Sequence, residues 1–443
     1  MTRRDPIQVR EYQYLTAKGC GRSDCHPLGA ESLRMLREFV LLNRSDDEDD
    51  PHELMRLRSL KSVGGAIEAI QLQNYVGVVE LADGLQIEIL PKIDVSKEGN
   101  EQEIFLTMLR TLGSDMSFKS LNSAHLRASR MPMFEVFIGM FLSEAADVVR
   151  MGLRSAYIEQ RSEERFVRGK IDFAREVKKN PAHAERINVI HDEYMVNRPE
   201  NRLIKTTLLS LRGISRSNEN IRLIRRLLTA FDEIDESHNV NADFARCTNN
   251  RGTSMYRNLL SWCRVFLKHE SFTPLQGENV AFALLFPMES VFEDYVGKEL
   301  HRRAIGNGCL ERVKLQAQSE YLFETGRGRV RMRPDILCTC HGGRRVVLDA
   351  KWKRVKDYND IKTADMYQMY AYGQRYAIEG EERQHVVLLY PWHEEVARGL
   401  YREGRHISKD RVQVDVFFVD LENMEDSMDE LLGLIEDPSV LEG

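Results

Sequence analysis

The spacing of hydrophobic and polar residues changes several times along the chain, and each change predicts a different kind of element. Residues 33–42 form an amphipathic stretch, and strict alternation follows between Ala66 and Ile93. Two alternating segments there flank Asp83-Gly84, a pair that favours the tight turn of a β-hairpin. Helical spacing then prevails over 102–270. Within that region the expected elements are helices over 201–213, 220–234 and 256–269 and a short β-like piece over 166–172.

A second change of pattern follows the segment Ser271–Gly277, where a proline and a glycine interrupt the helical spacing. We place a domain boundary there. Downstream, the expected elements are a helix over 288–300, strands over 330–340 and 345–352, a helix over 361–377, and strands over 385–390 and 412–419. This order predicts an α/β fold, α+β over the whole chain, in which helices flank a mixed sheet.

Three regions follow from these patterns. Residues 1–65 form an N-terminal extension whose role the sequence leaves open. Residues 66–270 form a β-hairpin with a helical domain, and residues 271–443 form the α/β domain with an acidic C-terminal tail. A chain of 443 residues has room for about two to three domains of ordinary size.

The composition is that of a soluble globular protein, with 42% hydrophobic and 30% charged residues. The longest apolar run, Val280–Phe286, is far shorter than the ~20 residues that a membrane span needs. The charged N-terminus has no apolar segment typical of a secretory signal, and the seven cysteines have no framework spacing. We therefore expect a cytoplasmic protein.

The net charge of −6 is unevenly distributed. Between His301 and Lys356 there are 14 Lys and Arg residues against 5 Asp and Glu residues, whereas residues 420–443 hold nine acidic residues and no basic ones. Clustered basic charge is typical of a surface that binds phosphates, although an ordinary solvated face gives the same pattern. The basic stretch is therefore compatible with a nucleic-acid partner without requiring one.

The residues that carry chemistry lie between Arg333 and Trp352. We expect Asp335 near the middle of the first strand, and Asp349 and Lys351 on one face of the second, because a spacing of two keeps side chains on the same side. A hairpin of this length brings Asp335 beside that pair. Two carboxylates and one ammonium are costly to bury unless they surround a cation, and carboxylate oxygens suit Mg²⁺, with Mn²⁺ as a substitute. We predict Asp335, Asp349 and Lys351 as catalytic residues and both aspartates as metal ligands.

Two helices supply candidate supporting residues. Glu293, on the helix before the hairpin, is a further candidate metal ligand, and Glu289 is its rival. Gln368 and Tyr372, on the helix after the hairpin, are four residues apart and share one helical face. Solvated surface residues give similar patterns, so these candidates depend on the central motif.

The arrangement Pro334-Asp335, thirteen residues, then Asp349-Ala350-Lys351 resembles the signature of the PD-(D/E)xK nucleases. In that fold the preceding helix often places another acidic residue at the metal site, which corresponds to Glu293. The pair Gln368 and Tyr372 resembles the Gln-x-x-x-Tyr pattern of RecB-like nucleases, where it contacts DNA and supports the site. The resemblance implies a restriction-endonuclease-like sheet and metal-dependent phosphodiester hydrolysis.

A wider resemblance covers about residues 65–420. The segments Asn74–Val79 and Gly84–Ile93 are similar to the N-terminal hairpin of the McrC family. The segments Arg168–Phe173 and Asn201–Lys205 are similar to its middle region. McrC proteins are the nuclease subunits of McrBC-type, modification-dependent (5-methylcytosine) restriction systems. The resemblance implies an endonuclease that cleaves methylated foreign DNA, and a partner, an McrB-like hexameric AAA+ GTPase, whose GTP hydrolysis the N-terminal half stimulates.

Other interpretations stay open. A stand-alone RecB-like repair nuclease is disfavoured by the long N-terminal half, and a non-catalytic adaptor of an AAA+ motor is disfavoured by the intact aspartates and lysine. Cys20-x₄-Cys25-His26 and Cys338-x-Cys340-His341 suggest zinc, but neither has a common zinc spacing. The chain has no Walker A ending, so we expect no nucleotide-binding site.

Overall fold

The protein is described here by a computed structural model, in which contacts divide the chain into two compact units. The first unit is Met1–Met133 with Ser271–Gly443, and the second is Phe134–Glu270. These two units do not coincide with the three regions expected from the sequence. The division into three regions stays a prediction. The predicted boundary segment 271–277 lies outside the described residues. The described residues are 6–43, 54–62, 65–96, 100–111, 131–179, 185–247, 254–268, 280–308, 310–323, 330–376, 378 and 383–436.

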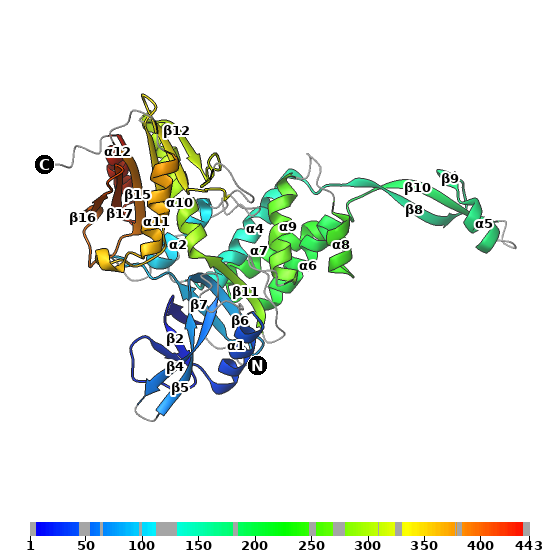
Figure 1. Cartoon of the computed structure of the whole chain (residues 1–443). Coiled ribbons are helices and arrows are strands. Elements are labelled where there is room, and N and C mark those ends of the chain that lie inside the picture. Colours follow the sequence, from blue (N-terminus) through cyan, green and yellow to red (C-terminus); the bar gives the residue numbers. More distant parts are fainter. Residues whose placement is uncertain are drawn as a thin grey trace. The chain divides into compact units, whose positions relative to one another are not determined.

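The N-terminal part of the first unit contains two four-stranded sheets, with strand orders β1-β7-β6-β11 and β3-β2-β5-β4 (Figure 1). Helix α1 (Ala30–Leu42) buries Leu33, Leu36 and Val40 in the core that these sheets share, which explains the amphipathic stretch. The strands are β1 (Ile7–Arg10), β2 (Tyr14–Thr16), β3 (Cys25–Pro27), β4 (Met55–Ser62), β5 (Gly65–Leu72), β6 (Tyr75–Leu81), β7 (Gln86–Leu90) and β11 (Val280–Pro287).

The predicted hairpin at Asp83-Gly84 is confirmed, because β6 and β7 pair antiparallel around it. Gly84 has a φ of 80°, and the Asp83 carboxylate accepts a hydrogen bond from the N–H of Leu85 at 3.0 Å. On its other side β6 pairs with β11, where the sequence pattern predicts no strand. Gly77 permits this close approach, since a Cβ there would lie 1.9 Å from the carbonyl oxygen of Leu284.

A six-stranded mixed sheet forms the C-terminal part of the first unit, in the order β12-β13-β14-β15-β17-β16. Strands β14, β15 and β17 are parallel, and the other three run antiparallel to their neighbours. The central strands are buried on both faces, which explains their nearly continuous apolar sequences. The strands are β12 (Leu310–Leu315), β13 (Ile336–Cys340), β14 (Arg345–Ala350), β15 (Gln384–Pro391), β16 (Gly399–Ile407) and β17 (Val412–Val419).

Helices cover both faces of this sheet, as the predicted fold class requires. Helices α10 (Met288–Asn307) and α12 (Met424–Glu436) pack on the face that carries Ile336 and Cys340. Helix α11 (Thr363–Arg375) packs on the opposite face through Gly373, which lies against Val386 and Val412. Helix α2 (Asn100–Thr111) packs on α10, and a short 3₁₀ helix, η3 (Tyr358–Asp360), precedes α11. The sequence pattern predicts neither β12, β16 nor α12.

The strand expected over 330–340 is shorter than predicted, and this corrects the place of Asp335. Regular pairing begins only at Ile336, so Asp335 precedes the strand instead of lying near its middle. Pro334 has no N–H to donate to a ladder, and Arg331 forms only an isolated bridge with Tyr321. Lys351 likewise follows β14 and does not lie within it.

The second unit contains a bundle of helices whose core is aromatic. Trp262 stacks on Phe266 with ring centroids 5.7 Å apart and packs against Phe137 at 6.2 Å. The predicted helices are confirmed, except that α7 ends at Leu228 and is followed by a 3₁₀ turn, η1 (Thr229–Phe231). In the described part of the chain no helix is long and apolar enough to cross a membrane. The helices are α4 (Met133–Met151), α6 (Pro199–Ile214), α7 (Asn218–Leu228), α8 (Val240–Arg246) and α9 (Ser254–Lys268).

A three-stranded antiparallel sheet extends from these helices and is called the arm, residues 156–195 (Figure 1). Strands β8 (Ala156–Glu164) and β10 (Ile187–Met195) pair along their whole length. Strand β9 (Lys170–Ile171) and α5 (Phe173–Lys179) lie near the far end. The sequence pattern predicts only the short piece over 166–172, because the charged strands of the arm lack apolar alternation.

A side-chain amide closes the base of the arm. The Nδ2 group of Asn201, a fully buried residue, donates to the carbonyl oxygen of Arg154 at 3.0 Å and to that of Val196 at 2.8 Å. Arg154 precedes the arm and Val196 follows it. This single amide therefore holds the two chain segments together where the arm begins.

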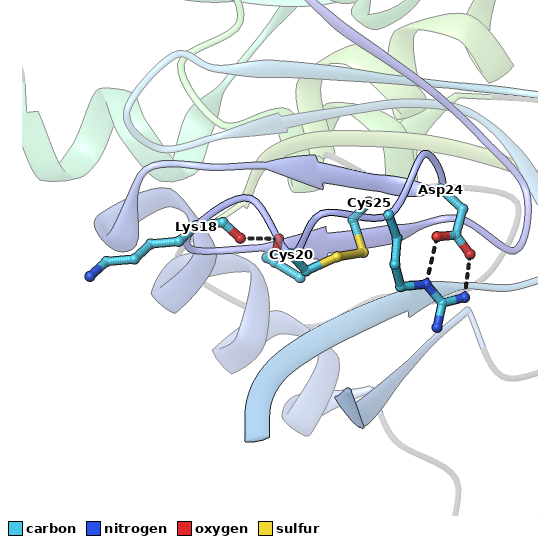
Figure 2. The surroundings of a disulfide bond; sticks show 6 residues. Lys18, Cys20, Asp24 and Cys25 are labelled. Atoms are coloured by element: carbon cyan, nitrogen blue, oxygen red, sulfur yellow. Dashed lines mark hydrogen bonds and ion pairs between the residues drawn. A yellow bond between two sulfur atoms is a disulfide. The ribbon is translucent and has the colours of Figure 1, made fainter. Parts of the chain in front are cut away.

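Cys20 and Cys25 form a disulfide bond in the loop that leads into β3 (Figure 2). The neighbouring Arg22 and Asp24 form an exposed ion pair, with two hydrogen bonds of 2.8 and 2.7 Å. His26 is hydrogen-bonded to Gln13 at 2.9 Å. The zinc interpretation therefore has no support, since both thiols of the first motif are consumed in the disulfide.

Candidate active site

The two predicted catalytic aspartates converge where β13 begins and β14 ends. Ile336 pairs with Leu348 across the two strands, so Asp335 lies beside the end of β14. There its Oδ2 accepts a hydrogen bond from the N–H of Ala350 at 2.8 Å. The chain thus brings together two carboxylates that are fourteen positions apart in sequence.

Asp349 and Lys351 form an ion pair inside the protein. The distance from Lys351 Nζ to Asp349 Oδ2 is 2.5 Å, and the Asp349 side chain is only 1% exposed. The second oxygen of Asp349, Oδ1, is buried and has no hydrogen-bond partner among the described residues. A buried carboxylate oxygen without a donor is costly, and a bound cation would satisfy it.

Glu293 joins this cluster from α10. Its Oε1 accepts from Nε2 of Gln316 at 2.8 Å, and its negative charge raises the pKa of Asp335. Glu289 lies one helical turn earlier, where its charge acts on Tyr12 instead. The structure therefore brings Glu293, and not its rival, to the two aspartates.

Gln316 belongs to the site, although the sequence pattern does not single it out. It bonds both Glu293 and Arg333, and its own N–H donates to the carbonyl oxygen of Asp335 at 2.7 Å. Gln316 has a φ of 47°, a left-handed conformation that is uncommon for a residue other than glycine. An isolated glutamine at the end of an unpredicted strand carries no sequence signal of this role.

Gln368 and Tyr372 hold the segment that leads to Asp335. On α11 the amide of Gln368 donates to the Tyr372 hydroxyl at 2.9 Å, as expected for residues on one helical face. The hydroxyl donates in turn to the carbonyl oxygen of Arg333 at 3.0 Å. The pair therefore fixes the backbone two residues before Asp335.

The electrostatics of the cluster favour a cation. Burial, followed by the charges of Asp349 and Glu293, raises the pKa of Asp335 to about 8. Burial also raises the pKa values of Asp349 and Glu293. Burial alone would lower the pKa of Lys351, but the surrounding aspartates outweigh it and raise that pKa. Glu293 thus adds negative charge to a pair of aspartates whose counter-charge is the Lys351 ammonium, so the three carboxylates resist ionisation together.

In this structure each carboxylate is bonded to a group of the protein: Asp335 to Ala350, Asp349 to Lys351 and Glu293 to Gln316. Among the described residues no three His, Cys, Asp or Glu side chains are already arranged as a metal site. The oxygen donors and the unpartnered Oδ1 of Asp349 nevertheless fit a hard divalent cation. The roles predicted for these residues stay predictions.

The fold and the site define a class of protein, an α/β chain whose mixed sheet carries a buried cluster of carboxylates and one lysine. A model of the family described as "McrBC 5-methylcytosine restriction system component" matches residues 70–391. Because this match spans more than half of the chain, the chain belongs to that family. The resemblance to McrC proteins is confirmed.

Solved structures include similar folds. The half-complex from a tetradecameric assembly of Thermococcus gammatolerans McrB AAA+ hexamers with bound McrC is matched with a TM-score of 0.67 and 19% identity, over 96% of this chain and 100% of that one. A cryo-EM structure of the Thermococcus gammatolerans McrBC complex is matched with a TM-score of 0.48 and 20% identity, over 68% of this chain and 88% of that one. Among curated proteins, none matches.

Proposed function

We propose that this chain is the endonuclease subunit of an McrBC-type restriction complex and hydrolyses the phosphodiester bonds of methylated DNA with Mg²⁺. The observation that carries the proposal is the convergence of Asp349 and Glu293 on Asp335, with the ammonium of Lys351 paired to Asp349. Carboxylate clusters of this kind are typical of metal-dependent phosphate chemistry, and family membership supports it.

The residues of the cluster have separate tasks in this proposal. Asp335, Asp349 and Glu293 would hold Mg²⁺, which when bound stabilises negative charge on the phosphate and lowers the pKa of water. Lys351 stabilises the charge that develops on phosphorus-bound oxygens or orients the attacking water. Its side chain is only 19% exposed, and a shielded charge acts more strongly than one in bulk water.

The arm supports the second part of the proposal, which is docking on an McrB-like AAA+ GTPase. Large apolar side chains gather at its far end, where Phe166 is 83% exposed. Exposed apolar groups of this size mark surfaces that bind other proteins. In the similar Thermococcus gammatolerans assembly, McrC is bound to McrB AAA+ hexamers. Among the described side chains of the arm, the large apolar ones that are exposed are Phe166, Val167, Phe173 and Val177.

One reconstitution tests both parts. The full chain is mixed with its AAA+ partner, GTP, Mg²⁺ and methylated or unmethylated duplex DNA, and cleavage and GTP hydrolysis are measured together. We expect cleavage of methylated DNA that needs the partner and stops in EDTA, and GTP hydrolysis above the partner's basal rate.

Each alternative function gives a different result in that experiment. Full cleavage without partner or GTP would identify a stand-alone nuclease. Stimulated GTP hydrolysis without any cleavage, unchanged when Asp349 is replaced by Asn, would identify a non-catalytic adaptor. Full cleavage in excess EDTA would exclude the metal-dependent mechanism.

A further inference from the structure

A buried carboxylate in the N-terminal segment touches the loop that carries the predicted catalytic lysine. Glu11, directly after β1, is 1% exposed. Both of its carboxylate oxygens lie 3.1 Å from Nε1 of Trp352, and Oε2 also accepts from the N–H of Lys92 at 2.9 Å. One side chain therefore joins three segments that are far apart in sequence.

Trp352 connects Glu11 to both sides of the candidate site. It follows Lys351 directly, and its ring centroid is 5.4 Å from that of Phe292. Phe292 directly precedes Glu293, and both aromatic side chains are buried. Because buried side chains are closely packed, a displaced Trp352 would move the backbone beside Lys351 and the helix beside Glu293.

The backbone around Glu11 is adapted to this contact. Tyr12, the next residue, has a φ of 65°, which is rare for a bulky residue and persists only where surrounding contacts enforce it. The Tyr12 hydroxyl bonds to Asn74, whose carbonyl oxygen accepts from the N–H of Met288 at 2.9 Å, at the start of α10. The turn at Glu11 and Tyr12 is therefore also linked, through Asn74, to the helix that carries Glu293.

A carboxylate suits this position better than an amide would. Glu11 accepts from two N–H donors: both of its oxygens lie 3.1 Å from Nε1 of Trp352, and Oε2 also accepts from the N–H of Lys92. A glutamine has one oxygen, so its NH₂ group would face one of those donors. In either orientation that NH₂ group lies beside the N–H of Trp352, so glutamine sets two donors against each other there while keeping the size and shape of the side chain.

We propose that Glu11 is a positioning residue of the nuclease site, which acts through Trp352 on the placement of Lys351 and Glu293. This inference rests on the proposed function. It assigns to the N-terminal extension, whose role the sequence leaves open, the support of a site more than three hundred positions away in the chain.

The test compares Glu11→Gln and Trp352→Phe with Asp420→Asn as the matched control. Asp420 is another buried carboxylate of the first unit, which accepts from the N–H of Glu422 at 3.0 Å and pairs with Arg398 at 3.0 Å. Each full-length variant is measured for folded fraction, for the kcat and KM of DNA cleavage with the partner, and for Mn²⁺ affinity by calorimetry without it.

We expect Glu11→Gln and Trp352→Phe to lower kcat and weaken Mn²⁺ binding by about 10- to 100-fold, with KM for DNA unchanged, because a displaced supporting residue commonly has an effect of that size. The double variant should lose no more activity and Mn²⁺ affinity than the more impaired of the two single variants, since both changes break the same hydrogen bond. Asp420→Asn should keep both properties.

Three outcomes would overturn the inference. In the first, Glu11→Gln cleaves and binds Mn²⁺ like the wild type. In the second, the two single effects multiply in the double variant, so that the residues act independently. In the third, the control loses as much activity per folded molecule as Glu11→Gln. A wild-type chain that neither cleaves nor binds Mn²⁺ contradicts the proposed function itself, and the inference falls with it.

Discussion

The six-stranded sheet of the first unit and the arm of the second are both β-structures, yet they place opposite kinds of side chain in unfavourable surroundings. The sheet buries carboxylates at the junction of β13 and β14, where desolvation disfavours their charged form. The arm has charged strands and exposes aromatic and branched apolar side chains at its far end. Each region departs from the ordinary solvent preference of its side chains.

The difference shows which kind of function each region supports. A buried charge cluster is stabilised by binding a counter-ion, so the sheet is suited to chemistry on a metal-bound phosphate. An exposed apolar cluster is stabilised by contact with another apolar surface, so the arm is suited to recognition of a protein. Variants that affect one region and not the other test this division.

The largest effect is expected from the carboxylate cluster. Asp349→Asn or Lys351→Ala should reduce DNA cleavage by at least about 100-fold, because the first removes a proposed metal ligand and the second removes a cation that stabilises charge in the transition state. Stimulation of the partner's GTP hydrolysis should stay at the wild-type rate, and Glu31→Gln, on the exposed face of α1, should change neither activity. Cleavage by the Asp349→Asn protein at a rate near that of the wild type would remove Asp349 from the mechanism.

The arm should show the reverse behaviour. Phe173→Asp with Val177→Asp should weaken partner binding by about 30-fold or more, as expected when residues central to an interface are lost. Folding should hardly change, since both side chains are exposed. Binding is measured by titrating the partner, with Ile305→Asp on α10 as the control for an exposed apolar residue of the first unit. If the Ile305→Asp control lost as much affinity for the partner as the arm variant, the arm would not be the docking surface.

The pH dependence of stability separates the buried cluster from the rest of the molecule. In the metal-free folded chain Asp335 has a pKa of about 8, while the unfolded chain releases this proton near pH 4. The stability that the protonated group provides is therefore present below about pH 4 and is lost as the pH rises toward about 8, by at most about 1.4 kcal/mol per pH unit. Asp335→Asn, which stays neutral, should lack this loss.

Urea unfolding in EDTA between pH 5 and 8 measures this difference. The free energy of unfolding of Asp335→Asn should exceed that of the wild type by a margin that grows with pH. Added Mg²⁺ should reduce the margin, because binding to the folded state of the wild type stabilises it. A margin independent of pH would show that Asp335 is ionised throughout this range.

The smallest effect is expected from the disulfide, which belongs to neither the sheet nor the arm. Replacing Cys20 and Cys25 by Ser opens a short loop and should lower the free energy of unfolding by about 2 kcal/mol. DNA cleavage and GTPase stimulation should stay within about two-fold of the wild type. Chemical unfolding of the oxidised, reduced and Ser-substituted proteins checks this, and a large loss of either activity would link this loop to function.

Much of the site could be predicted from the sequence because its chemistry is encoded locally. The spacing of Asp349 and Lys351 places both side chains on one side of an extended segment, and the spacing of Gln368 and Tyr372 places theirs on one helical face. The apolar strands around Asp349 indicate burial. Asp335 is found beside the pair, as predicted, but outside the strand, because Pro334 delays its start.

Local patterns also predicted elements whose stability depends on near neighbours. The turn at Asp83-Gly84 and the helices over 201–213 and 256–269 have their signals within a few residues of one another. The strands of the arm were not predicted, because charged and polar residues interrupt both sequences and neither alternates apolar with polar residues over its whole length.

Only the tertiary structure decided the contacts between distant segments. The pairing of β11 with β6, the bonds of Gln316 to Glu293 and Arg333, and the burial of Glu11 against Trp352 each join residues that no local period relates. Their energies come from packing and hydrogen bonds that exist only once the chain has folded. By itself the sequence determined which groups are candidates for the proposed chemistry, and the fold decided which of them meet and what holds them in place.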